Sequence, residues 1–301
     1  MKKVILPGTD LEVSRLCLGT DRFGLDPHAS DSDILRLFLV NGGNFIDTAH
    51  VYSDWVPGES SRSEKQLGRL FKNFDRKQII LSTKGAHYHF ENPGINRVRP
   101  EEIIRDLDES LACLDTDCID LYFLHRDNPE IPVDEIMDCL NEQRRLGKIR
   151  WLGCSNWTLP RIREAAEYAD RTGQQPFAVN QLMWSMAEIN RAAIPADYAV
   201  MDCETLAYSR DHQMGIMCFS SQAKGYFTKR WLDKEPGPDL RRVYDNERNE
   251  QLFRQLSVLK SAEAVTAHCL RFFEEQPVTA VPIVSCSSPE QLMECCSAFK
   301  E

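Results

Sequence analysis

Four side chains with acid–base chemistry lie at the ends of short apolar runs or just past them. Asp47, Lys84 and His125 each end such a run, and Tyr52 follows Asp47 by five residues. A free phenol, with a pKa of about 10, is a weak acid at neutral pH. A nearby ammonium lowers that pKa, so Lys84 can activate Tyr52 while Asp47 keeps Lys84 charged and oriented. His125 can donate a hydrogen bond to a reacting oxygen. We therefore expect a proton-transfer site if the chain brings these run ends together.

The apolar runs are typical of buried strands, because they are short, partly β-branched and bounded by turn residues. A stretch long enough for a helix separates each run from the next, which predicts a parallel sheet. Reactive groups at the C-terminal ends of the strands favour an α/β fold of the (β/α)8, TIM-barrel type. The strands are expected at 15–18, 44–47, 79–84, 119–125, 151–155, 177–181, 215–219 and 278–284.

Helices are expected between these strands, at 32–40, 63–71, 100–114, 133–146, 159–171 and 202–212, then in a stretch through 259 and at 262–275. An N-terminal β-hairpin (4–6 with 11–13) precedes the barrel, and a C-terminal extra helix begins after Ser288, a plausible N-cap. The 301 residues slightly exceed the ~250 of a typical barrel. No linker or internal repeat interrupts the pattern, so we expect a single domain spanning residues 1–301.

Net charge, apolar content and cysteine content indicate which kinds of partner the protein has. The net charge of −10 argues against nucleic acid or an anionic membrane as the main partner. No apolar stretch approaches the ~20 residues of a membrane span, and the N-terminus does not read as a signal peptide. The 11 cysteines are scattered without a Cys-x-x-Cys pair and are interpreted as reduced, buried residues. These features predict a cytoplasmic protein that acts on small molecules.

Several motifs together resemble the aldo-keto reductase superfamily. They begin with Asn44-Phe-Ile-Asp47-Thr-Ala-His-Val-Tyr52 and Ser63-Glu64, and they occur in order along nearly the whole chain: Ser82-Thr-Lys84, Asp120-Leu-Tyr-Phe-Leu-His125, Gly147-Lys148 to Ser155-Asn156, and Asn180-Gln181. The resemblance implies an NAD(P)H-dependent oxidoreductase that interconverts a carbonyl compound (an aldehyde, ketone or sugar) and an alcohol by hydride transfer. It implies Tyr52 as general acid/base in a catalytic tetrad with Asp47, Lys84 and His125. The absence of a Gly-x-Gly-x-x-Gly after a strand fits a cofactor site unlike the Rossmann one.

The resemblance also implies where ligands bind. NADP is the expected cofactor, with NAD possible because no basic residue marks the segment from Ser285 to Glu294 for the 2′-phosphate. We expect the cofactor to contact Gly19, Thr20, Asp47, Ser155, Asn156, Gln181, Phe219, Ser220, Gln222, Lys224, Ser285, Ser287, Gln291 and Glu294. We expect the substrate to contact Trp55, His87, Trp157 and Trp184.

Other interpretations of these residues stay open. A lone Asp or Lys at a strand end is most often a solvated loop residue, and Phe219 or the tryptophans could serve packing alone. His87 and His89 could belong to a metal site, but too few convergent ligands accompany them, so we expect no metal. The rival from another class is a nucleotide-binding regulatory barrel that does not turn over, as in potassium-channel β subunits. The physiological substrate, the direction of the reaction and the oligomeric state are left open.

Overall fold

A computed structural model describes residues 1–26 and 30–300. Eight parallel strands close into a barrel in the order β10-β3-β4-β5-β6-β7-β8-β9. They are β3 (Cys17–Gly19), β4 (Phe45–Asp47), β5 (Ile80–Gly85), β6 (Ile119–Leu124), β7 (Ile149–Ser155), β8 (Val179–Met183), β9 (Gly215–Phe219) and β10 (Ala280–Val284). The expected (β/α)8 barrel is confirmed, and the strand bounds differ from the predicted ones mainly by one or two residues.

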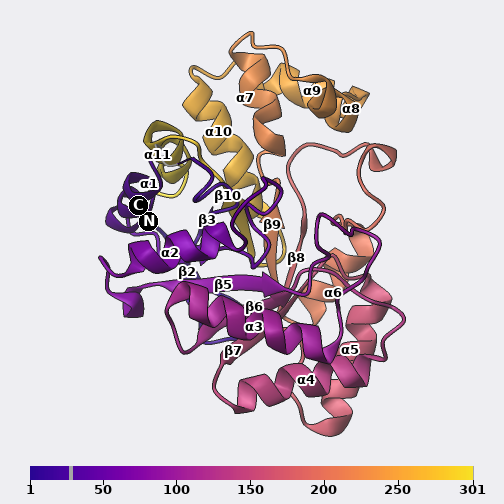
Figure 1. Ribbon diagram of the computed structural model, residues 1–301. Coiled ribbons are helices and arrows are strands. Elements are labelled where there is room, and N and C mark those ends of the chain that lie inside the picture. Colours follow the sequence, from indigo (N-terminus) through magenta and orange to yellow (C-terminus); the bar gives the residue numbers. More distant parts are fainter. Residues whose placement is uncertain (27–29, 301) are drawn as a thin grey trace.

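Helices alternate with the strands and surround the barrel (Figure 1). They are α1 (Asp31–Val40), α2 (Arg62–Phe71), α3 (Pro100–Leu114), α4 (Val133–Arg145), α5 (Leu159–Thr172), α6 (Cys203–Asp211), α10 (Ala262–Arg271) and the C-terminal α11 (Pro289–Ser297). Short 3-10 turns are η1 (Arg76–Gln78), η2 (Arg191–Ala193), η3 (Ala223–Gly225) and η4 (Phe272–Glu275). The side chain of Ser288 caps α11 by accepting from the backbone N–H of Gln291, as expected.

The hairpin of β1 (Lys3–Ile5) and β2 (Glu12–Ser14) lies outside the barrel sheet but closes one of its ends. Leu6, Leu11 and Val13 are buried in the same apolar cluster as the barrel-interior residues Phe45 and Val179. This plug fills the end away from the C-terminal strand ends. The opposite end is therefore the one left available for ligands.

The main difference from expectation lies between β9 and α10. The sequence predicted one loop and a helix there, whereas the chain forms three short helices, α7 (Tyr226–Trp231), α8 (Pro238–Tyr244) and α9 (Glu247–Leu256). They lie together in orange at the top of Figure 1. Tyr226, Tyr244 and Leu252 join α10 in a separate apolar cluster. This packing explains the excursion, because such short helices are stable only when an apolar face is buried.

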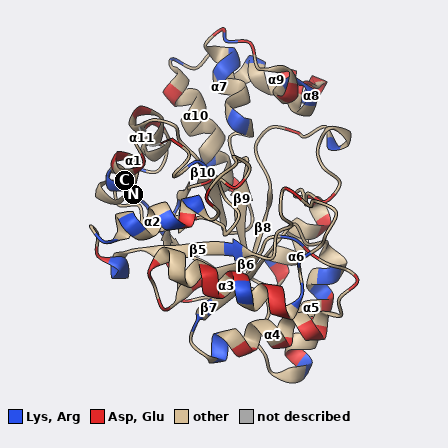
Figure 2. Cartoon of the chain, viewed as in Figure 1, with Lys and Arg blue, Asp and Glu red and all other residues tan. Residues whose placement is uncertain are grey.

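Most charged residues lie in the outer layer, and the Lys84–Asp47 pair at the strand ends is a buried exception. The strands are almost free of charged residues in Figure 2, whereas α3, α4 and α5 carry both signs. None of the helices in the described part of the chain has both the length and the apolar character needed to cross a bilayer. All cysteines are free, and most are buried. Contrary to the expectation that they are buried, Cys203 is exposed and Cys113, Cys118 and Cys139 are partly exposed.

Candidate active site

A cavity of about 910 Å³ opens where the barrel strands end. Residues from the ends of β3, β4, β7, β8, β9 and β10 line it, together with the turn after β6 and the segment from η3 through α7. Its volume lies in the upper part of the ~300–1,000 Å³ range of small-molecule sites. This is the face of a (β/α)8 barrel on which catalytic residues gather.

The ammonium of Lys84 is the centre of the site. It donates to Asp47 Oδ2 at 2.6 Å, to the Thr48 carbonyl oxygen at 2.6 Å and to the Tyr52 hydroxyl at 3.0 Å. Lys84 has no exposed surface, and Asp47 is 1% exposed. All three donors of the ammonium are thus used inside the protein, which fixes its position and offsets the cost of burying it.

The strand register explains how these side chains meet. Asp47 pairs with Ser82 across β4 and β5, and residues two apart on a strand share a face, so Ser82 and Lys84 both point toward Asp47. Asp47 Oδ1 accepts from Ser82 Oγ at 2.8 Å and from Gln181 Nε2 at 3.1 Å. A turn after β4 brings Tyr52 back over the strand end through a bond from its backbone N–H to the Ala49 carbonyl. Both carboxylate oxygens of Asp47 therefore accept hydrogen bonds from neighbouring side chains.

Burial is the main influence on the pKa of Tyr52. Burial, and next the Asp47 carboxylate, raise the pKa of Tyr52 well above its usual value of 10. The expectation that Lys84 lowers this pKa below that of a free phenol is therefore not met. Tyr52 is a neutral phenol at physiological pH, and Lys84 lies where it can stabilise a phenolate once the proton has left.

The two imidazoles beside Tyr52 are neutral. The ring of His125 lies 5.8 Å from that of Tyr52 and 4.6 Å from that of His87, measured between centroids. Burial lowers the pKa of His87 to about 4, with a smaller contribution from the Arg126 charge. Burial also lowers the pKa of His125 well below its usual value, assisted by His87 and Arg126. A neutral His125 can donate one ring N–H, and its Nδ1 is buried without a hydrogen-bond partner among the described residues.

Most of the expected cofactor residues line this one cavity. They are Gly19, Asp47, Ser155, Asn156, Gln181, Phe219, Ser220, Gln222, Lys224, Ser285, Ser287, Gln291 and Glu294. Thr20 is the exception: it is fully buried, and its hydroxyl hydrogen-bonds to Ser63 and to the Asp47 carbonyl. Thr20 therefore supports the strand end rather than facing the cavity.

Gly19 allows β3 to lie close to the side chains of β10 in the cavity wall. A Cβ at this position would lie 2.8 Å from Ile283 Cγ2 and 2.8 Å from Ser285 Oγ, so a larger residue would require these β10 side chains to move. Ser287 donates to Gln291 Oε1 from both its backbone N–H and its hydroxyl, at 3.0 and 2.9 Å. These contacts order the entry to α11, whose N-terminal N–H groups and dipole favour an anion.

The four expected substrate residues separate into two groups. Trp55 lines the cavity; His87 does not line it but packs against His125, which does. Trp157 is 1% exposed, packs edge-on against Phe177 and lies outside the cavity. Trp184 also lies outside it and packs against Phe272 and Phe273. The prediction that these two tryptophans wall the pocket is not met, because both side chains fill apolar layers around the barrel.

Sequence reasoning missed several cavity residues. Arg126 follows His125 directly, and that adjacency was the available signal. Tyr198 comes from the long segment between β8 and α6, where no periodic pattern marked it. Others that line the cavity are Asp21, Arg22, Lys229 and Lys234.

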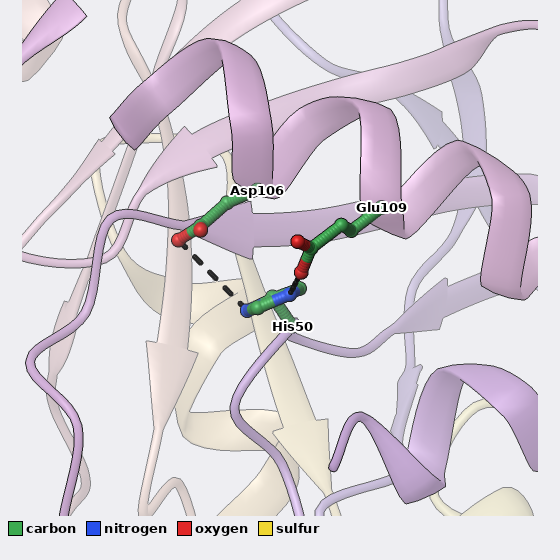
Figure 3. Close-up of side chains that lie close together, drawn as sticks. All are labelled: His50, Asp106 and Glu109. Atoms are coloured by element: carbon green, nitrogen blue, oxygen red, sulfur yellow. Dashed lines mark hydrogen bonds and ion pairs between the residues drawn. The ribbon is translucent and has the colours of Figure 1, made fainter. Parts of the chain in front are cut away.

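A second polar cluster lies on the outer side of β5. Figure 3 shows His50 between Asp106 and Glu109, with Nε2 2.8 Å from Glu109 Oε2 and Nδ1 3.8 Å from Asp106 Oδ2. These three residues could hold a cation by their spacing. However, Arg97 donates to both oxygens of Asp106, at 2.5 and 2.9 Å, and the Ala86 N–H donates to Oδ2 at 2.8 Å. With Asp106 engaged in this way, the cluster is an ion-pair network.

The network holds the loop that carries His87. Besides its bonds to Asp106, Arg97 donates to the His87 carbonyl at 2.8 Å. Ala86, whose N–H Asp106 accepts, has a left-handed φ of 59°, which is unfavourable for a residue with a Cβ. Arg97 and Asp106 thus fix the backbone on both sides of the bend and, through His87, the position of the His125 ring.

The chain is similar to known oxidoreductases. A sequence model of the aldo/keto reductase family matches residues 15–301. The uncharacterized oxidoreductase YrpG of Bacillus subtilis is 29% identical over 310 residues, covering 100% of this chain and 91% of that protein. The aldo-keto reductase YhdN of the same organism is 24% identical, covering 97% and 87%. The aldo-keto reductase yakc of Schizosaccharomyces pombe, whose name includes NADP(+), is 29% identical and covers 83% and 69%.

Proposed function

The chain belongs to the aldo/keto reductase family of oxidoreductases, and we propose that it interconverts a carbonyl compound and an alcohol with NADP(H), using Tyr52 as general acid/base. The observation that carries the proposal is the chain of hydrogen bonds from Asp47 through Lys84 to Tyr52 at the cavity. A family fold alone would not support turnover, because function depends on the site built on a fold. This site has a proton donor, a charge to stabilise its conjugate base and a neutral imidazole.

The protein residues account for the proton and the charge. When bound, the nicotinamide supplies the hydride. The carbonyl oxygen gains negative charge, and Tyr52, which is a neutral phenol at neutral pH, donates its proton to that oxygen. Lys84 then lies 3.0 Å from the phenolate oxygen and stabilises it. His125 donates a hydrogen bond to the same substrate oxygen and orients it.

The chemistry of the cavity fits a dinucleotide. Phe219 lines the cavity and offers an aromatic surface for a flat group. Lys224, Lys229 and Lys234 line the same cavity and can neutralise phosphate charge. The choice of NADP over NAD is supported by the printed name of the Schizosaccharomyces pombe relative and by Ser287 and Gln291, which supply hydrogen-bond donors without a guanidinium.

The test is a panel of aldehydes, ketones and sugars, assayed by nicotinamide absorbance with NADPH and with NADH. We expect steady turnover of at least one aldehyde, with a modest preference for NADPH. The Tyr52→Phe protein, assayed in parallel, is expected to bind nucleotide and not turn over. If the wild-type protein binds nucleotide tightly and reduces none of the panel, the regulatory-barrel interpretation replaces this one.

A further inference from the structure

Arg126 is a buried guanidinium that the proton-transfer chemistry does not use. It follows His125 in sequence and lines the cavity together with Tyr52 and His125. Its side chain is only 11% exposed. An arginine keeps its charge in proteins, so this is a permanent positive charge close to the reacting groups.

The hydrogen-bonding capacity of Arg126 is only partly used. Nη1 donates to the His125 carbonyl at 3.0 Å. Nε lies 3.0 Å from Asp197 Oδ2 but is buried without an aligned hydrogen bond. Among the described residues, Nη2 makes no hydrogen bond or ion pair. A guanidinium has five N–H donors in a fork that matches a carboxylate, so one edge remains for a ligand.

The charge of Arg126 is also only weakly compensated. Asp197 is 48% exposed, and a pair with one partner in water is worth little. The rings of Tyr198 and Tyr88 flank the guanidinium, with centroids 5.1 and 5.8 Å from its carbon. Cation–π contacts with these rings do not use the N–H groups of the guanidinium, which remain for hydrogen bonding.

We propose that Arg126 binds a carboxylate of the substrate, so that the preferred substrates are carbonyl compounds carrying an acid group on an apolar or aromatic body. This inference rests on the proposed function and names its substrate class. The aromatic body is argued from Trp55, which lines the cavity and is 43% exposed. Its ring meets those of Tyr52 and Phe90 edge-on, at 6.5 and 6.1 Å.

The cavity does not attract anions indiscriminately. Asp21 also lines it and its Oδ1 is buried without a partner among the described residues, so it repels an anion that comes near. A carboxylate is therefore accepted where it reaches the free edge of Arg126 directly. Lys224, Lys229 and Lys234 also line the cavity, so the substitution of Arg126 itself is what separates its contribution from the charge of the cavity.

The experiment compares 4-carboxybenzaldehyde with its neutral methyl ester, methyl 4-formylbenzoate. We expect the wild-type kcat/KM to favour the acid by about 10-fold or more, as a charge-assisted bidentate contact would give. Arg126→Met should remove that preference while the ester loses about threefold or less. Arg126→Lys keeps the charge without the fork and should give an intermediate ratio. Arg22→Met is the matched control, because Arg22 is the other arginine of the cavity.

The outcomes separate this inference from the proposed function. Turnover of both aldehydes with an acid-to-ester ratio that Arg126→Met leaves unchanged, or that only Arg22→Met abolishes, overturns the role of Arg126 alone. Absence of all turnover overturns the proposed function. In that case, binding of 4-(hydroxymethyl)benzoate measured by calorimetry still tests Arg126: loss of binding in Arg126→Met supports the site, and equal binding in both proteins contradicts it.

Discussion

The hydroxyl of Tyr52 lies 3.0 Å from the ammonium of Lys84, and that bond is the third of the three that the ammonium makes. The other two, to Asp47 and to the Thr48 carbonyl, hold Lys84 whether or not Tyr52 is present. Tyr52 can therefore be altered without freeing the buried charge. This asymmetry allows the chemistry of the site to be tested separately from its stability.

Replacing Tyr52 with Phe is expected to lower the rate of carbonyl reduction by about 10²- to 10⁴-fold, the usual contribution of a general acid. Nucleotide affinity should stay nearly unchanged, because Lys84 keeps two of its three partners. Steady-state kinetics and a fluorescence titration with NADPH measure the two effects. Retention of more than half the wild-type rate would show that Tyr52 is not the acid.

Lys84→Met should weaken activity and move the basic limb of the pH profile to higher pH. Loss of the ammonium disfavours the phenolate, so the pKa of Tyr52, already raised by burial, rises further. Asp47→Asn should move the limb the other way while Lys84 stays charged, because the Asp47 carboxylate contributes to the raised pKa. The measurement is kcat/KM for reduction against pH, with circular dichroism to check folding. Identical profiles in all three proteins would mean that the pair is only structural.

His87 should make the fold sensitive to acid. Its pKa is about 4 in the folded protein and near 6.5 in an unfolded chain. Between these pH values His87 binds a proton in the unfolded chain but not in the folded one. The free energy of unfolding is therefore highest above pH 6.5 and falls as the pH drops toward 4. The loss attributable to His87 is about 3 kcal/mol. His125, with a pKa lowered in the same direction, adds to it.

Urea unfolding at pH 7 and pH 4.5 measures this contribution. The His87→Asn protein should lose less of its free energy of unfolding between the two pH values than the wild type. His89→Asn, two residues along the same loop and exposed, is the matched control and should follow the wild type. Equal losses in the wild-type and His87→Asn proteins would contradict the assignment.

The cluster of His50, Asp106 and Glu109 in Figure 3 should behave, together with Arg97, as an ion-pair network. Arg97→Met leaves the buried Asp106 without its main partner and should cost about 3–5 kcal/mol of unfolding free energy. Glu109→Gln alters a side chain that is 53% exposed and should cost less than about 1 kcal/mol. Denaturant unfolding with and without a chelator distinguishes the interpretations: a drop in stability on adding the chelator would identify a bound cation instead.

Ser287→Arg should tighten NADP binding by about 1–3 kcal/mol through a charge-assisted contact and change NAD binding little. The backbone N–H of Ser287 keeps its bond to Gln291 Oε1, so the entry to α11 is preserved. Ser287→Gln is the neutral control. Competitive titration of both nucleotides measures the change. A wild-type preference for NADP beyond about a thousandfold, roughly 4 kcal/mol, would point to a cationic anchor such as Lys229 or Lys234.

The barrel and the core of its site could be predicted because both depend on local patterns. Most of the strands are apolar runs with a polar residue at or just past their end, and the carboxyl ends of parallel strands meet at one face. Asp47 and Tyr52 are five residues apart, so a single turn brings them together. The positions of Asp47, Lys84 and His125 at strand ends are thus read from sequence order alone.

Tertiary packing decided what local patterns do not encode. Trp157 and Trp184 follow strands as Trp55 follows β4, yet only Trp55 lines the cavity, because the other two pack against Phe177 and against η4. The raised pKa of Tyr52 depends on how completely neighbouring elements exclude water. The free edge of Arg126 depends on Tyr88 and Tyr198, far away in sequence. The sequence by itself determined which residues stand at the strand ends; which of them face the cavity, and with what charge, followed from burial and long-range contacts that exist only in the folded chain.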